Sequence, residues 1–83
     1  MGQLLSSPQP VRVATDCYGK PIALLWHGRR DPVTVCNHWR LEGDWWRRRI
    51  AREYYRLLTN SGTVCTVYHD VDEGGWYLQK MLD

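Results

Sequence analysis

The sequence predicts one small, mainly β domain of about six short antiparallel strands, arranged as a small barrel or bent meander, with one short helical segment near residues 44–51. Three observations predict this fold. Alternating apolar and polar runs are separated by turn signals roughly every 8–12 residues. The chain has 83 residues, which leaves no room for a second core. Five Trp and five Tyr supply the large apolar side chains that so small a core needs.

The N-terminal segment lacks the pattern of the rest. Residues 1–9 are rich in Ser, Gln and Pro and have no periodicity, so they are expected to form a flexible tail. Residues 10–83 then form the single β domain.

The first strands are short. Val11 and Val13 alternate with polar or small residues, and the glycine within 17–20 predicts a hairpin turn. Residues 21–27 form a short apolar run, which favours a strand buried on much of both faces. Residues 28–32, with Gly and Pro, predict the next turn.

Residues 33–41 resume a period of two, which places alternate side chains on opposite faces of a strand. Val33, Val35, Asn37 and Trp39 are expected on one face, and Thr34, Cys36, His38 and Arg40 on the other. The first set is the better candidate for the core.

A break after this strand predicts the helical segment 44–51, whose first residue, an aspartate, is a favourable N-cap. Trp46 and Ile50 are four residues apart, so a helical turn would place both on one face. A longer helix running to Leu58 is an alternative. We expect a change to strand near Glu53, because the following residues favour β structure.

The last strands form two hairpins. Residues 54–59 and 63–69 are joined by a tight turn over 60–62, and the second run is dense in Val and Thr. Residues 70–75 turn the chain again, and 76–82 return as the final strand.

The aromatic residues divide into two sets. Those expected to be buried are Trp26, Trp39, Trp46, Tyr54 and Trp76. Exposure of Trp45, Tyr55 or Tyr77 would instead indicate a binding surface.

Cysteine usage favours a reducing compartment. Cys17, Cys36 and Cys65 are odd in number and widely spaced, which is not the pattern of a disulfide framework. The N-terminus lacks the features of a signal peptide, and no apolar run approaches the ~20 residues that span a bilayer. A cytoplasmic protein without a membrane segment is expected.

Catalytic and metal-binding motifs are absent from the sequence. Cys36 with His38 and Cys65 with His69 could make a zinc site or a thiol–imidazole pair if their strands were neighbours. Residues four apart along a strand are ~13 Å apart, however, which is too far to share one ion. We therefore expect neither an enzyme, nor a metal, nor a cofactor.

One segment, residues 45–56, interleaves arginines with aromatic residues. The candidate binding residues in it are Trp45, Arg47, Arg48, Arg49, Arg52, Tyr55 and Arg56. Guanidinium groups bind phosphates, and aromatic rings stack on bases, as in single-stranded nucleic-acid grooves. The same residue types are hot spots of protein interfaces. They also occur as a solvated rim over core aromatics.

Several motifs resemble those of a known bacterial family. They are Trp26-His27-Gly28-Arg29, Val33-Thr34-Val35 leading to Trp39, Trp45-Trp46-Arg47, Arg52-Glu53-Tyr54-Tyr55-Arg56-Leu57, Gly62, and Gly75-Trp76-Tyr77-Leu78. Over about residues 10–83 the chain resembles a small domain of unknown function that also forms the C-terminal end of ImuB-type proteins, inactive relatives of Y-family polymerases in bacterial mutagenesis cassettes. It departs from the pattern at Gln79-Lys80, where the family usually has His-Gly.

The resemblance implies an accessory role beside translesion DNA synthesis, with no catalytic residues. Together with the arginine-rich segment, it predicts a non-catalytic binding domain of DNA damage tolerance that contacts nucleic acid. Its partner would be single-stranded DNA or a mutagenesis or replication protein. The alternative is a protein-interaction or homodimerisation module without nucleic-acid contact.

Overall fold

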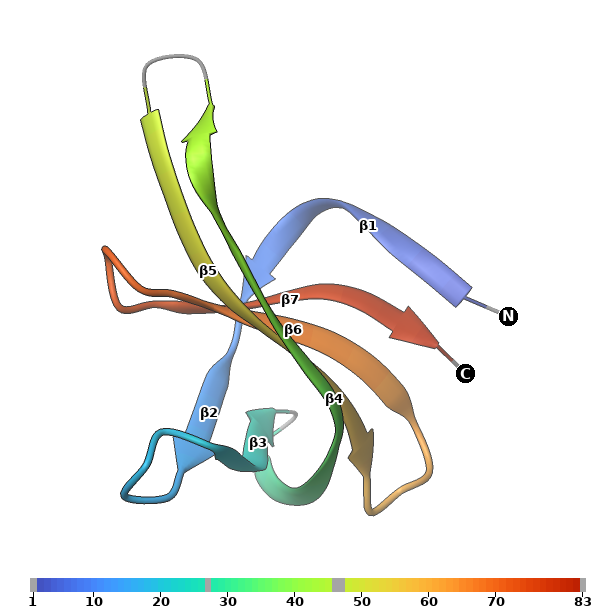
Figure 1. Ribbon diagram of the computed structural model, residues 1–83. Helices are drawn as coiled ribbons and strands as arrows, with labels where there is room; N and C mark the ends of the chain where they lie inside the picture. Colours follow the sequence, from blue (N-terminus) through green and yellow to red (C-terminus); the bar gives the residue numbers. More distant parts are fainter. Residues whose placement is uncertain (1, 27, 46–47, 83) are drawn as a thin grey trace.

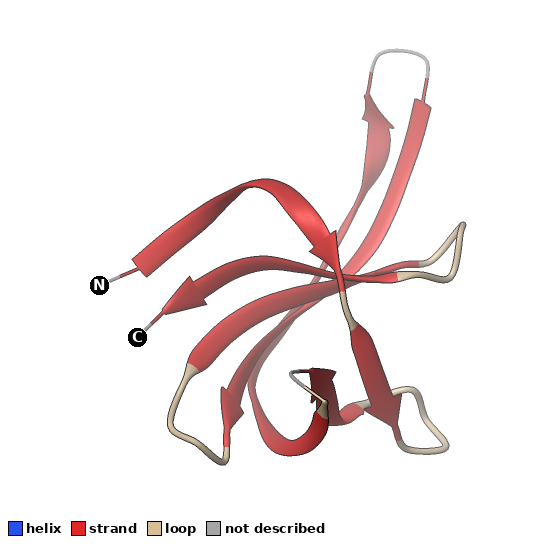
Figure 2. Cartoon of the chain, turned by 180° about the vertical axis from the view of Figure 1, so that it is seen from behind, coloured by secondary structure: helices blue, strands red, loops and turns tan. Residues whose placement is uncertain are grey.

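The computed structural model describes the backbone of residues 2–26, 28–45 and 48–82, and the side chains of 8–26, 28–43 and 50–81. Seven antiparallel strands form this part of the chain: β1 (Gly2–Pro10), β2 (Arg12–Thr15), β3 (Pro21–Trp26), β4 (Arg29–Trp45), β5 (Arg48–Thr59), β6 (Val64–Asp70) and β7 (Trp76–Leu82). They form one sheet in the order β1-β7-β6-β5-β4-β3-β2, curled into a half-barrel (Figures 1 and 2). The prediction of a mainly β, antiparallel fold is confirmed.

The two outermost strands of this order, β1 and β2, are consecutive in the chain. The Val11 N–H between them donates to the carbonyl of Trp76, at 3.0 Å, so the bent β1–β2 segment pairs with β7 through its first part and with β3 through its second. The expected tail over residues 1–9 is therefore paired as a strand from Gly2 onward. Pairing with β7 satisfies backbone groups of an otherwise open edge and requires no apolar side chains, which explains why the polar composition did not indicate it.

The longest hairpin is formed by β4 and β5, and it replaces the expected helical segment. Gly43, Asp44 and Trp45 lie opposite Ile50, Arg49 and Arg48. The helix predicted over 44–51 is thus wrong for residues 44–45 and 48–51, while 46–47 lie outside the described residues. An isolated helix of two turns has marginal stability, whereas pairing of these residues as strands adds hydrogen bonds to a ladder that already runs along β4.

The core lies on one face of the sheet. Leu24, Leu57, Cys65 and Val67 form a fully buried cluster there. We call this the inner face. Alternation along β5 places Arg56 and Leu58 on the opposite, outer face, where Leu58 is 40% exposed while Leu57 is 0% exposed.

A β-bulge in β4 changes which side chains reach each face. Val35 lies opposite Leu57, but the next pair is Asn37 with Arg56, so Cys36 is an extra residue. The face expected for Val33 and Val35 is confirmed, because both pack against the core. Beyond the bulge the expected faces are exchanged.

The exchange overturns the expected burial of Trp39, which lies on the outer face and is 38% exposed. The burial expected for Tyr54 is confirmed, at 6% exposed. Trp26 and Trp76 are partly buried against the core. The side chains of Trp45 and Trp46 lie outside the described residues.

Candidate nucleic-acid interface

Four aromatic side chains cross the outer face in one row. Trp39 of β4, Tyr54 of β5, Tyr68 of β6 and Tyr77 of β7 lie directly opposite one another on adjacent strands. Their ring centroids are 5.5, 5.2 and 5.2 Å apart in that order. These distances are within the range of favourable ring–ring contacts, so the row is a continuous aromatic ladder.

The members of the aromatic ladder differ in their access to solvent. Tyr54 and Tyr68 are only 6% and 4% exposed, so their role is to hold the strands together. Trp39 ends the ladder and is 38% exposed. Its ring lies within 4° of parallel to that of Tyr54, which fixes its orientation and leaves an accessible aromatic surface.

Arg52 lies over the ladder. Its guanidinium carbon is 4.6 Å from the Tyr68 ring centroid, and its Nη1 donates to the Tyr54 hydroxyl at 3.4 Å. The hydrogen bond to Tyr54 outweighs partial burial and raises the pKa of Arg52 above its ordinary value. The residue therefore provides a positive charge beside the aromatic ladder, with Asp70 directly opposite it on β6.

Arg56 borders the ladder on its other side. It is exposed, lies opposite Asn37 and Thr66, and has no ion-pair partner among the side chains that the structure describes. Thr66 in turn lies opposite Lys80, so this row contains a second cation. The aromatic ladder therefore has cationic side chains on both sides.

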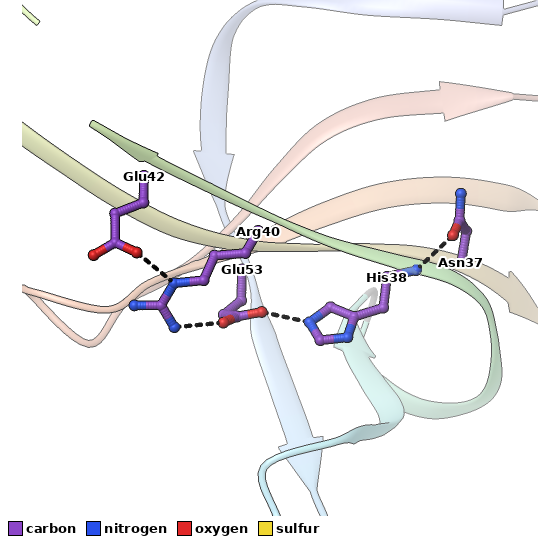
Figure 3. Close-up of polar contacts among 5 residues, drawn as sticks. All are labelled: Asn37, His38, Arg40, Glu42 and Glu53. Carbon is purple, nitrogen blue, oxygen red and sulfur yellow. Dashed lines mark hydrogen bonds and ion pairs between the residues drawn. The ribbon is translucent and has the colours of Figure 1, made fainter. Parts of the chain in front are cut away.

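The inner face has a different electrostatic character, formed by the charged residues drawn in Figure 3. Glu53 accepts hydrogen bonds from His38 and from Arg40 Nη1, the latter at 2.8 Å, and Arg40 Nε contacts Glu42 at 3.2 Å. The His38 ring also stacks on Tyr55, with centroids 4.5 Å apart. Arg40, the arginine of this network, already has two carboxylate partners, so the network has little attraction for phosphate.

The protonation of Glu53 reflects these contacts. Partial burial acts to raise the pKa of its carboxyl group, but the hydrogen bonds from His38 and Arg40 outweigh burial, and the pKa lies below its ordinary value. Glu53 is thus held ionised as the acceptor of the network.

The candidate residues named from sequence are divided between the two faces. Arg52 and Arg56 are on the outer face beside the aromatic ladder, whereas Tyr55 is on the inner face and packs against the core. Trp45 and Arg48 lie opposite each other near the end of the β4–β5 hairpin, with Arg49 next in β5, and their side chains lie outside the described residues, as does all of Arg47.

Sequence reasoning missed the aromatic ladder, although part of it had a signal. Tyr54 and Tyr68 are each seven residues from Ser61, the centre of the turn 60–62, so folding that hairpin symmetrically brings them together. The contribution of Trp39 depends on the bulge at Cys36, for which the sequence gives no clear sign.

The cysteine and histidine pairs considered from sequence are not neighbours. β4 and β6 are separated by β5, which places Cys36 and Cys65 two strands apart, about 10 Å. Within the described ranges, no three His, Cys, Asp or Glu side chains are grouped so that they could hold a metal ion. The same ranges contain no helix long and apolar enough to cross a membrane.

Comparisons with protein-family models, with curated proteins and with solved structures found no match to this chain.

Proposed function

We propose that this domain is a non-catalytic binding domain that contacts single-stranded nucleic acid through its outer face, as an accessory of bacterial DNA damage tolerance. The observation that supports the binding role is the exposed Trp39 ring, stacked on Tyr54 and bordered by Arg52 and Arg56 on β5. The setting in translesion synthesis rests on the family resemblance alone.

The chemistry of this surface suits a nucleic-acid strand. A base stacks on the exposed Trp39 ring, which contributes about 1–3 kcal/mol in comparable sites and requires no particular sequence. Arg56 and Arg52 neutralise the flanking phosphates. Because Trp39 is already held against Tyr54, little side-chain entropy is lost when a base arrives.

The β4–β5 hairpin is longer than the strand beside it. β6 pairs with β5 only between Arg52 and Leu58, so the hairpin projects beyond its neighbour (Figure 1). The candidate residues Trp45, Arg47, Arg48 and Arg49 belong to this segment by sequence, and their part in binding stays a prediction from the sequence.

The test is fluorescence anisotropy of a labelled oligothymidine at two salt concentrations. Binding is expected at low salt and should weaken steeply as salt rises, because each neutralised phosphate releases counterions. Trp39→Ala should weaken binding by about 5- to 150-fold, the equivalent of 1–3 kcal/mol. The matched control is Tyr18→Ala, which removes an aromatic side chain that is 91% exposed in the β2–β3 turn. No binding by the wild type at low salt would refute the proposal.

A protein partner or a second copy of the chain is the second candidate. It is favoured by Leu41, which is 49% exposed on the outer face two residues beyond the exposed Trp39. Trp and Arg are common hot spots of protein interfaces. Size-exclusion chromatography with light scattering tests self-association, and a monomer at all concentrations would exclude a homodimer.

The proposed location is the cytoplasm. All three cysteines are free thiols, two of them exposed, which fits a reducing compartment.

A further inference from the structure

A second group of cationic side chains lies on β2, β3 and β4. Arg12, Leu25 and Arg30 are directly opposite one another on these three strands, so both guanidinium groups project on the same side of the sheet, with Leu25 between them. Both arginines are exposed, and Leu25 is 37% exposed.

These three residues form part of an open cavity of about 490 Å³, whose remaining lining residues are Trp26, Gly28 and Arg29. Three of the six lining residues are arginines, and none is acidic. The adjacent carboxylate, Asp31, already accepts hydrogen bonds from Trp26 Nε1, at 3.4 Å, and from Ser61 Oγ, at 3.1 Å. The cavity is therefore a concentration of positive charge at an apolar surface.

The cavity is suited to an anion. Arg12 and Arg30 are two strands apart, about 9–10 Å at their backbones, and both are drawn toward a negative charge placed between them. Gly28, at the β3–β4 turn, has a φ of 74°, and a Cβ built on it meets no atom within 4 Å. The turn therefore leaves space beside the guanidinium groups.

The cavity and the aromatic ladder share the outer face. Arg30, Pro32 and Thr34 are exposed at alternate positions of β4, and after the bulge the same face continues through Asn37 and Trp39. From Arg30 to Trp39 the strand spans at most about 30 Å. A single ligand that follows β4 can reach both Arg30 and Trp39.

We propose that Arg12 and Arg30 form a second phosphate-binding site, which holds backbone phosphates of the same single-stranded nucleic acid whose base stacks on Trp39. This inference rests on the proposed function. It assigns the ligand an approximate path, from the β2–β3–β4 end of the outer face along β4 to the aromatic ladder. It also predicts that a neutral ligand does not use the site.

The experiment measures the salt dependence of oligothymidine binding by anisotropy, using a 16-mer, the upper end of the range of about 4–16 nucleotides covered by comparable small β domains. Arg30→Gln should lower the slope of log K against log salt concentration by about 0.7, and the double variant Arg12→Gln/Arg30→Gln by about 1.4, because each lost contact leaves one phosphate unneutralised. Lys20→Gln is the control. Lys20 is an exposed cation in the β2–β3 turn, five residues and at most about 17 Å along the chain from Leu25, and its substitution should leave the slope unchanged.

The outcomes separate the two proposals. If the wild type binds, Trp39→Ala weakens binding and the double variant keeps the wild-type slope, then the second site is refuted while the proposed function stands. If the wild type does not bind, the proposed function fails and the second site with it. Inorganic phosphate is tested as a competitor at matched ionic strength. Competition at millimolar phosphate that the double variant abolishes would assign the site to the free anion and overturn the strand path.

Discussion

Leu57→Ala tests the register of β5, on which both faces of the domain depend. Leu57 is 0% exposed and belongs to the buried cluster with Leu24, Cys65 and Val67. Truncating a fully buried leucine costs about 2–5 kcal/mol. A domain of 83 residues is stabilised by only about 4–12 kcal/mol in total. We therefore expect a loss of about 3 kcal/mol, a large fraction of the stability.

Urea unfolding followed by tryptophan fluorescence measures this loss. With an m-value of about 1.5 kcal/mol/M, the midpoint should fall by about 2 M. Leu58→Ala is the matched control, since it removes the same atoms from the next residue, which is 40% exposed, and should cost about 1 kcal/mol or less. If Leu58→Ala were the costlier change, β5 would be shifted by one residue, and Arg52 and Arg56 would lie on the inner face.

Two further predictions concern titration. Glu53→Gln should flatten the dependence of the free energy of unfolding on pH in acid. Because the pKa of Glu53 is lowered in the folded state, its ionised carboxylate stabilises the fold above about pH 4.5, and this contribution is lost as the pH falls through the folded-state pKa. Urea midpoints at pH 7 and pH 3 should therefore differ less in the variant than in the wild type. Burial, with a smaller effect of Asp31, raises the pKa of the Cys65 thiol to about 11, so at pH 8 only about one Cys65 in a thousand is a thiolate. Iodoacetamide should therefore modify the exposed Cys17 and Cys36 in the native protein, but all three cysteines in urea. A third adduct formed at the same rate under native conditions would contradict the burial of Cys65.

The sequence predicted the fold class because alternation and turn chemistry are local. The turns at 17–20 and 60–62 join strands close to where the sequence placed them, and Gly19 and Gly62 adopt the positive φ that such turns need. The helical segment was mispredicted because a spacing of four between apolar residues also occurs by chance in a strand. A ladder that continues from β4 overrides so weak a local preference.

The candidate site was less predictable, because it depends on long-range register. Nothing at Cys36 marks a bulge, yet that one extra residue exchanges the faces of His38 and Trp39. If Cys36 instead paired with Arg56 in a regular ladder, Trp39 would face the core and His38 would lie on the same side as Arg56. Composition indicated the residue types of the candidate site, Trp and Arg, but only pairing across strands decides which of them meet.

The bulge also explains how one short sheet separates two electrostatic environments. Beyond Cys36, β4 contributes His38 and Arg40 to the inner face, where Glu53 of β5 accepts hydrogen bonds from both. The same shift brings Trp39 beside Tyr54 on the outer face, between the positions of Arg52 and Arg56, which are not paired to this carboxylate. A regular ladder, in which Cys36 paired with Arg56, would reverse both arrangements at once, because it would set His38 opposite Tyr54 and place Arg40 on the face of Arg52 and Arg56. The proposed binding surface consequently depends on the irregular pairing of β4 at Cys36.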